Sequence, residues 1–265
     1  SGLDACAAIA GLTLADGRRV EGDFFVDATG FRALLIGETL GAPFVSYAEN
    51  LFNDSAVVAP TPASAQATPS QTRAVAMKFG WRWDIPLTNR HGNGYVYSSR
   101  YCTHEEAERE FRSALGLADD ATVRRLSMRV GRSEKHWAAN CLAVGLSQGF
   151  IEPLEATALH LVQSTVELFI EYVDEDGFKP TRRDAFNEAI NARFEGVRDY
   201  IVCHYRMNGR SDTPYWRDAA AVSALSSSLD RVLSCWFSGG DLREEVRQQG
   251  IDAYYRAMSW QALLA

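Results

Sequence analysis

The chain has 265 residues, a formal net charge of −7 and 46% hydrophobic residues, which is ordinary for a globular protein of one large or two small domains. The acidic balance argues against a non-specific nucleic-acid partner, because such binding needs a basic face that neutralises phosphates. No apolar run reaches the roughly 18 residues that span a bilayer. We therefore predict neither a nucleic-acid partner nor a membrane partner.

The cysteine and histidine residues are scattered. Five cysteines lie far apart without a C-x-x-C pair, and the five histidines form no H-x-x-x-H pair. This pattern argues against a disulfide framework or a zinc cluster, and we predict a cytoplasmic protein without a metal site. Only three of the 27 basic residues are lysines, which leaves few candidates for lysine-dependent chemistry.

The first 70 residues combine a hairpin with loops. Alternating residues predict strands at 7–14 and 20–26, which are joined by a turn at Asp16-Gly17. Residues 31–70 show no clear periodicity and are predicted to be mostly loop. The stretch at 59–71, rich in Pro, Ala, Ser and Thr, is expected to be exposed.

Strands and one helix are expected between residues 72 and 150. We predict strands at 72–83 and 94–99 around a glycine-containing turn at 91–94. Thr103 and Glu106 have the spacing of a capping box for a helix at 105–115. Short strands are also expected at 122–129, 133–137 and 141–145.

The character of the sequence changes after Gly149. Apolar residues at i, i+3, i+4 and i+7 predict a helix from residue 156, and Thr181 is expected to begin a second long helix. Shorter helices are predicted at 219–236 and 241–248. Strands that are followed by helices predict an α+β fold. The predicted division is into a β-rich part at 1–150 and a helical part at 151–265.

Two tryptophans stand at i and i+2 in residues 80–87 (GWRWDIPL). In an extended segment Trp81 and Trp83 point to the same face, and the strand is expected to end at Pro86, because proline cannot donate to a central ladder. The indoles are candidates for the wall of a pocket for a flat ligand. Spacing alone favours the simpler interpretation that they are aromatics packed on a sheet.

Residues 149–158 (GFIEPLEATA) connect a buried strand to the long apolar helix. Such a turn presents unpaired backbone N–H groups at the positive end of the helix dipole, where anions bind. Glu155 has two interpretations that the sequence leaves equally open. It either caps the helix, or it is a carboxylate beside an anion site that transfers a proton or stabilises a cationic intermediate.

Aromatic residues also gather between two predicted helices. Tyr205 ends one helix, and Tyr215 and Trp216 follow Thr213-Pro214, which is a favourable helix start. These aromatics are candidates for a clamp on a ligand, although the residues alone favour a helix corner packed by aromatic rings.

Taken together, these segments resemble the flavin-dependent tryptophan halogenases. The W-x-W-x-I-P sequence of residues 81–86, the block at 149–157 and the D-A-T-G sequence of residues 27–30 match that family's motifs in the family's order. The resemblance implies a mixed sheet of an FAD-dependent, hydroxylase-like fold, followed by a mainly helical substrate domain.

The resemblance also implies an activity. Reduced FAD, supplied by a flavin reductase, and oxygen convert chloride or bromide to hypohalous acid, which halogenates an electron-rich aromatic substrate such as indole or tryptophan. Glu155 takes the catalytic role, and Thr157 and Ala158 bind the halide through their backbone N–H groups. The resemblance implies cofactor contacts at Gly30, Trp81, Trp83, Ile85, Pro86 and Gly149. It implies substrate contacts at Tyr205, Tyr215 and Trp216. Whether the protein forms a homodimer is left open.

The chain departs from the family's pattern in two respects. It lacks the G-x-G-x-x-G motif and the catalytic lysine that the family carries earlier in the sequence, so we expect this chain to be inactive alone. Ala156, Ala158, His204 and Ser211 differ from tryptophan-specific members, which leaves indole or another electron-rich arene open as the substrate. The alternative hypotheses are a fragment of a flavin monooxygenase or reductase, and a non-catalytic domain that retains the fold.

Overall fold

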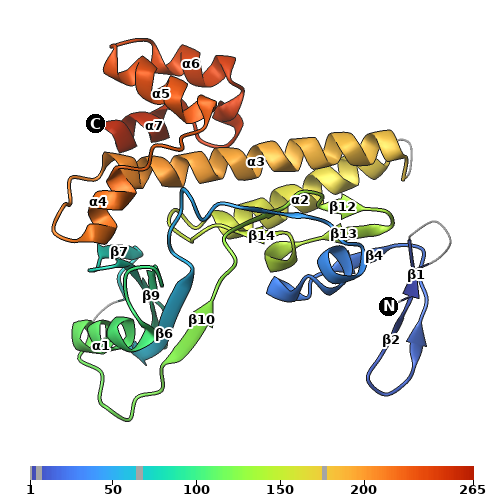
Figure 1. Ribbon diagram of the computed structural model, residues 1–265, viewed down its shortest axis with the longest axis horizontal. Helices are drawn as coiled ribbons and strands as arrows, with labels where there is room; N and C mark the ends of the chain where they lie inside the picture. The colour runs from blue at the N-terminus through green and yellow to red at the C-terminus, as the bar shows by residue number, and fades with distance from the viewer. Residues whose placement is uncertain (1, 4–7, 64–67, 175–177) are drawn as a thin grey trace. The chain divides into compact units, whose positions relative to one another are not determined.

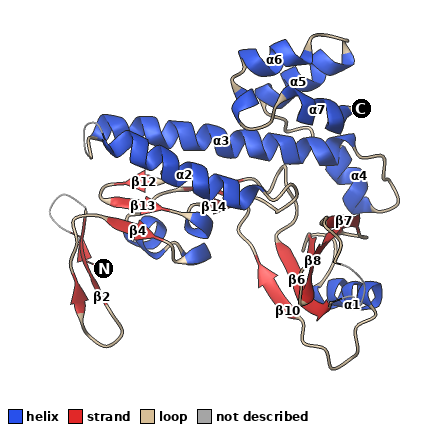
Figure 2. Ribbon diagram, turned by 180° about the vertical axis from the view of Figure 1, so that it is seen from behind, coloured by secondary structure: helices blue, strands red, loops and turns tan. Residues whose placement is uncertain are grey.

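The computed structural model describes residues 2–3, 8–63, 68–174 and 178–265 of the chain (Figure 1). They belong to two compact units. The first comprises Ser1–Tyr47, Arg129–Tyr200 and Val246–Arg256, and the second comprises Ala48–Met128, Ile201–Glu245 and Ala257–Ala265. Both units contain helices and strands, which confirms the α+β class (Figure 2). Because each unit draws on residues before and after 150, the division of the chain at that residue stays a prediction about domains.

The strands of the first unit form small sheets. β4 (Phe25–Asp27) and β13 (Cys141–Ala143) pair in parallel, and β12 (Trp137–Ala138) adds an antiparallel strand to β13. A second sheet has the order β14 (Gly149–Phe150), β11 (Gly131–Ser133) and β5 (Phe44–Ser46). A third sheet consists of β1 (Gly2–Leu3), β2 (Ile9–Thr13) and β3 (Arg19–Val20).

In the first unit, α2 (Thr157–Asp174) and the first part of α3 (Pro180–Met207) run side by side beside β12 and β13 (Figures 1 and 2). The fully buried Trp137 of β12 contacts both helices edge-on. Its ring centroid lies 5.0 Å from that of Phe169 on α2 and 5.8 Å from that of Phe186 on α3. Aromatic rings bury large apolar areas, so this cluster holds α2 and α3 against β12. Short helical turns complete the unit: η1 (Gly30–Arg32), η2 (Leu34–Thr39), η3 (Gly145–Ser147) and η4 (Ile251–Ala253).

An antiparallel sheet dominates the second unit. Its strands are, in spatial order, β10 (Arg124–Ser127), β6 (Ser55–Pro62), β9 (Arg90–Tyr97), β8 (Gly80–Pro86) and β7 (Arg73–Ala76). One face carries the buried Tyr95 and Tyr97, which pack with Phe111 and Ala107 of α1 (His104–Leu115). This unit also contains the end of α3, the helices α4 (Pro214–Ala220), α5 (Ser227–Phe237) and α7 (Ala257–Leu264), and the first part of α6 (Leu242–Gln248).

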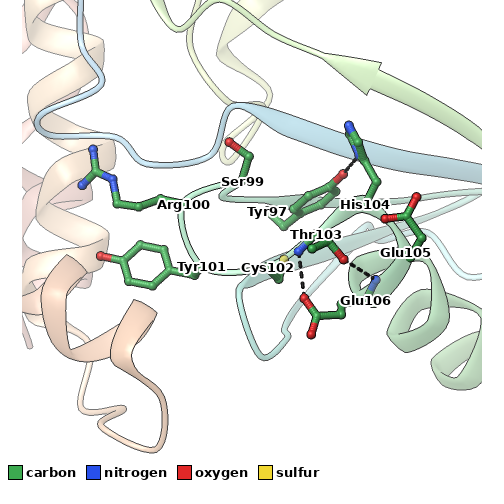
Figure 3. A pocket seen from close by; sticks show the side chains of 9 residues that line it. All are labelled: Tyr97, Ser99, Arg100, Tyr101, Cys102, Thr103, His104, Glu105 and Glu106. Carbon is green, nitrogen blue, oxygen red and sulfur yellow. Dashed lines mark hydrogen bonds between the residues drawn. The ribbon is translucent and has the colours of Figure 1, made fainter.

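The predicted capping box of α1 is confirmed. The Glu106 amide donates to the Thr103 hydroxyl at 3.2 Å, and the Thr103 amide donates to the Glu106 carboxylate at 2.8 Å (Figure 3). In the same view the Tyr97 hydroxyl is hydrogen-bonded to Nδ1 of His104. These side chains line an open surface pocket of about 500 Å³. Local side-chain chemistry therefore determines where α1 begins.

The glycine-rich segment of the second unit was predicted wrongly as a turn. Residues 91–94 lie inside β9, and the chain turns earlier, where the Leu87 amide donates to the Arg90 carbonyl at 2.8 Å. The predicted strand at 72–83 is two strands, β7 and β8, which pair with each other. Gly94 is therefore a strand residue, and the absence of a side chain there leaves room for the Trp83 indole.

Three further boundaries differ from the prediction. The strand predicted at 20–26 is split, because residues from Phe25 onward pair in parallel with β13. The stretch predicted as loop at 31–70 contains η2, β5 and all of β6. The helix predicted at 219–236 is two helices, since α4 ends at Ala220 and the Ser226 hydroxyl caps α5 by accepting from the Leu229 amide at 3.0 Å.

Candidate active site

The turn before α2 has an unusual backbone. Glu155 and Ala156 both adopt the left-handed conformation, with φ angles of 70° and 54°, and the Ala156 amide donates to the Pro153 carbonyl at 3.0 Å. A residue with a Cβ pays about 1–3 kcal/mol for such a conformation, so two in succession are kept only when the surroundings or the function require them. The Glu155 side chain is exposed at this turn.

Thr157 adds a second irregularity. It is the first residue of α2, its side chain is buried, and among the described residues its hydroxyl group has no hydrogen-bond partner. The amides of the first helical turn also lack intrahelical acceptors and lie at the positive end of the helix dipole. An orphaned hydroxyl group and a helix N-terminus together form a site that suits an anion.

A cavity of about 170 Å³ lies next to this turn in the first unit. Ala158 and Gly149 border it, and Phe194 of α3 contributes an aromatic side chain. The other lining residues are mostly apolar: Gly145, Leu146, Gln148, Phe150, Ile151, Leu159, Leu161 and Val162. An anion bound at the start of α2 would therefore face a weakly polar environment, where its charge interactions are stronger than in water.

Gly149 is explained by packing. A Cβ atom at this position would stand 2.5 Å from the Gly131 carbonyl oxygen and 3.0 Å from Cε1 of Phe194. The close pairing of β14 with β11 therefore requires glycine here, whatever else the residue does. Its predicted contact with the cofactor stays a prediction.

Asp27 connects the D-A-T-G segment to η3, the helical turn that precedes β14 and α2. Its fully buried carboxylate accepts hydrogen bonds from the Leu35 and Ile36 amides at 2.8 and 2.9 Å, from the Thr29 amide and hydroxyl group, and from the Ser147 hydroxyl group at 3.0 Å. Burial raises the pKa of Asp27, but the hydrogen bonds from Thr29, Ile36 and Leu35 outweigh it and leave the pKa below its usual value.

Asp27 also positions Gly30. The Ser147 hydroxyl group that donates to Asp27 lies 3.2 Å from the Gly30 carbonyl oxygen. Gly30 is left-handed, with a φ of 74°, and a Cβ atom there would meet nothing within 4 Å. The sequence interpretation named Gly30 and missed the positioning roles of Asp27 and Ser147, although the D-A-T-G motif contains the signal for Asp27.

The two tryptophans of the second unit are on one face of β8, as predicted. Their ring centroids are 6.1 Å apart with an interplanar angle of 60°. Trp81 is buried, whereas Trp83 is half-buried and lines a surface cavity of about 530 Å³. A Cβ atom at Gly94 would stand 2.0 Å from Cζ2 of Trp83, so the indole lies flat on this glycine. β8 ends with Ile85, whose side chain is 39% exposed, and Pro86.

The aromatic cluster of the second unit is tied into the core. Asn53 donates to the Tyr205 hydroxyl group at 2.9 Å and accepts from the Tyr215 hydroxyl group at 3.0 Å. The Trp216 indole N–H donates to the Met77 carbonyl at 2.8 Å. All three aromatic side chains are buried, so packing accounts for them, and their contact with a substrate stays a prediction. Asn53, which joins two of them, was missed because it lies more than 150 positions away in the sequence.

The structure thus divides the predicted site residues between the units. Gly30, Gly149, Glu155, Thr157 and Ala158 lie in the first unit, and hydrogen bonds and the cavity link their segments. The second unit holds the remaining predicted residues: Trp81, Trp83, Ile85, Pro86, Tyr205, Tyr215 and Trp216.

Comparison with known proteins identifies the family. A family model described as tryptophan halogenase matches residues 2–265. The chain belongs to the tryptophan halogenase family. It is 43% identical over 218 residues to a tryptophan 6-halogenase of Streptomyces toxytricini, which is 80% of this chain and 42% of that relative. It is 39% identical over 217 residues to a tryptophan 7-halogenase of Lentzea aerocolonigenes, or 81% of this chain and 41% of that relative.

Solved structures agree with this assignment. The crystal structure of the S. toxytricini tryptophan 6-halogenase matches 99% of this chain and 52% of its own length, with a TM-score of 0.91 and 38% identity. A flavin-dependent halogenase from Brevundimonas sp. BAL3 matches 89% of this chain and 48% of its own, with a TM-score of 0.83 and 38% identity. This halogenase chain spans about half the length of the curated relatives it matches.

Two further observations concern the described part of the chain. Its helices are too short or too polar to cross a bilayer. Within the same residues, no three His, Cys, Asp or Glu side chains converge to hold a metal ion.

Proposed function

We propose that the whole protein is a flavin-dependent halogenase that chlorinates or brominates an indole- or tryptophan-like arene through hypohalous acid. The observation that supports this function best is the start of α2, where the left-handed Glu155 and Ala156 precede the orphaned hydroxyl group of Thr157. The left-handed backbone of this turn is costly for residues with a Cβ atom, and the turn lies in the block that carries the family resemblance.

The residues at the start of α2 fit a halide. Within the part of the chain that the structure describes, the buried Thr157 hydroxyl group is a donor without an acceptor, and the amides of Thr157 and Ala158 lie in the first turn of α2. In the proposed mechanism these amides hold the halide at the edge of the apolar cavity. Hypohalous acid would transfer its halogen to a ring carbon as the oxygen–halogen bond breaks and hydroxide leaves. The Glu155 carboxylate would then accept the ring proton, which restores the aromatic ring, and the proton and hydroxide leave as water.

The segment around Gly30 fits FAD, because its left-handed backbone leaves open space where a side chain would otherwise stand. When bound, reduced FAD would supply electrons to oxygen, and the reduced oxygen would oxidise the halide to hypohalous acid. We assign further cofactor contacts to Gly149 and to Trp81, Trp83, Ile85 and Pro86. Tyr205, Tyr215 and Trp216 are assigned to the aromatic substrate, which their rings match in shape and polarity.

A partner and a location follow from this chemistry. A separate flavin reductase supplies the reduced cofactor, and the cytoplasm is the compartment that contains both. We also propose a homodimer, which size-exclusion chromatography with light scattering tests directly.

Product analysis of the full-length protein tests the function. The protein is incubated with a flavin reductase, FAD, NADH, oxygen and a panel of indoles, with and without chloride. We expect a product with the isotope pattern of chlorine, formed only when chloride is present. A hydroxylated product that forms without halide would instead identify a monooxygenase, and turnover of no arene under either condition would favour a non-catalytic domain.

A further inference from the structure

Two asparagines one turn apart on α3 hold the segment that leads into β12. Oδ1 of Asn187 accepts hydrogen bonds from the His136 and Trp137 amides at 2.8 Å each, and its amide nitrogen donates to the Trp137 carbonyl at 2.9 Å. One turn further along, the Asn191 amide nitrogen donates to the Glu134 carbonyl at 3.1 Å. These bonds hold the fully buried His136 against α3.

The protonation of His136 follows from its contact with Asn191. Nε2 of the histidine lies 2.9 Å from Oδ1 of Asn191, whose amide nitrogen already donates to a carbonyl. An amide oxygen can only accept, so Nε2 carries the proton and Nδ1 is a bare acceptor. Burial, together with the charge of Arg132, outweighs the hydrogen bond to Asn191 and lowers the pKa of His136 to about 3. The ring is therefore neutral at physiological pH.

The ring of His136 stacks on the ring of Phe194, with centroids 5.2 Å apart and an interplanar angle of 16°. Phe194 is buried and lines the cavity of about 170 Å³ that Ala158 also borders. Its Cε1 lies in the space that Gly149 leaves open, because a Cβ atom there would stand 3.0 Å away. A continuous series of contacts thus leads from Asn191 through His136 and Phe194 to the cavity beside the start of α2.

A histidine is a costly residue at this position if it serves only to pack. Its Nδ1 loses hydration on burial and has no donor among the described residues, whereas a phenylalanine ring would fill a similar volume without that loss. What the histidine adds is a ring that stacks and an N–H group that fixes the plane of this ring through Asn191. His136 is thus suited to hold Phe194 in one orientation.

We propose that His136 is a positioning residue for halide binding, because its ring, fixed by Asn191, holds the Phe194 ring in the wall of the cavity. The proposal rests on the proposed function, which places the halide at the Thr157 and Ala158 amides on the edge of this cavity. A Phe194 ring without its support can turn into this small cavity and occupy the space of the ion. Removal of the stack or of the hydrogen bond should therefore weaken halide binding.

Nuclear magnetic resonance of the histidine side chains tests the geometry without any enzymatic assay. The full-length protein is labelled with ¹⁵N in its histidines, and the His136 signals are assigned by their loss in His136→Leu. We expect a protonated Nε2 and a bare Nδ1 whose signals stay unchanged between pH 8 and pH 5. A protonated Nδ1, or a ring that titrates in this range, would overturn the proposal, because Asn191 would then not fix the ring.

Chloride binding to the full-length protein tests the positioning role, and broadening of the ³⁵Cl resonance measures it without turnover. We expect His136→Leu to weaken chloride binding and to raise the KM for chloride by about three- to tenfold, the range of one aromatic stack. The kcat at saturating chloride and the KM for the arene should change less than about twofold. Asn191→Ala at a half-buried position keeps the ring and removes its hydrogen bond, so we expect a smaller rise of about two- to threefold.

Phe186→Leu is the matched control. This fully buried ring lies on the same helix and contacts Trp137, away from the residues that line the cavity. Its removal should lower the melting temperature, as His136→Leu does, and leave chloride binding unchanged. If His136→Leu fails to fold, the comparison of Asn191→Ala with Phe186→Leu decides the matter.

Three results separate the positioning role from the proposed function. Wild-type chloride binding in the folded His136 and Asn191 variants, with only the melting temperature lowered, would show that His136 merely stabilises the fold. A wild type that binds chloride through this cavity but forms no halogenated product would refute the proposed function and leave the positioning role standing. A wild type that binds no chloride would refute both.

Discussion

Two of the sequence blocks that carry the family resemblance, residues 81–86 in β8 and residues 149–157 before α2, differ in backbone conformation. In β8, Trp81 and Trp83 occupy regular strand positions, and Gly94 on the neighbouring strand makes room for an indole. Before α2, by contrast, Glu155 and Ala156 are left-handed, and the next residue, Thr157, buries a hydroxyl group that has no partner among the residues described. A regular conformation that packing explains says little about function. A costly backbone conformation beside a buried hydroxyl group that lacks a partner among the described residues indicates residues that are kept for chemistry.

The largest expected effect comes from the carboxylate of the strained turn. Glu155→Gln in the full-length enzyme should lower kcat for halogenation by about 10²–10⁴-fold, the usual contribution of a positioned acid–base group. Glu171→Gln on the exposed side of the same helix is the matched control and should keep the wild-type kcat. If both variants retain full activity, the strained turn before α2 has no catalytic role, and the two blocks do not differ in function.

Asp27 offers a test of what holds the first unit together. Asp27→Asn replaces an acceptor of several hydrogen bonds with a group that must also donate, and we expect a loss of about 2–4 kcal/mol in the free energy of unfolding at pH 7. The pKa of Asp27 is lower in the folded protein than its usual value. Its stabilisation is therefore present above about pH 4 and is lost as the pH falls through the folded pKa.

Urea unfolding at several pH values measures this dependence. The difference in stability between the wild type and Asp27→Asn should be largest near neutral pH and should shrink in acid. A difference that stays constant between pH 7 and pH 3 would show that the carboxylate charge is not what stabilises the segment.

Gly94 tests the regular block. Gly94→Ala places a Cβ atom on the Trp83 indole and should lower the free energy of unfolding by about 1–3 kcal/mol, the usual cost of overpacking. Gly92→Ala on the same strand is the control, because the nearest atom to its Cβ would be 3.9 Å away. Equal stabilities of the two variants, measured by urea unfolding, would mean that the indole does not need this glycine.

The smallest expected effect measures the strain before α2. Ala156→Gly removes the clash of a left-handed Cβ and should raise the free energy of unfolding by about 1 kcal/mol. Ala158→Gly lies two residues further on, inside the helix, and should lower it by about 0.5–1 kcal/mol. Opposite signs from two Ala→Gly changes support the strained turn, and a loss of stability in both would contradict it.

Local signals in the sequence predicted the helix starts well. Thr103 and Glu106 form the expected capping box, and Thr213 caps α4 with Pro214 as its first residue, because each signal depends on side chains a few residues apart. The boundaries that were missed depend on distant partners. The helical turn η2 has two amides bound by the Asp27 carboxylate, and β4 is defined by its pairing with β13.

The same distinction applies to the candidate site. Motif order was sufficient to name Glu155, Thr157 and Trp83. Nothing local announces that Glu155 and Ala156 are left-handed, since neither is glycine, or that the hydroxyl group of Thr157 is buried and unpaired among the described residues.

Bromide located by anomalous X-ray scattering tests the central claim most directly. Crystals of the active full-length enzyme in bromide should show an anomalous peak within hydrogen-bond distance of the Thr157 and Ala158 amides, and Thr157→Val should weaken it. An active enzyme whose crystals show no bromide at the start of α2 would contradict the claim that this strained turn is kept to bind a halide.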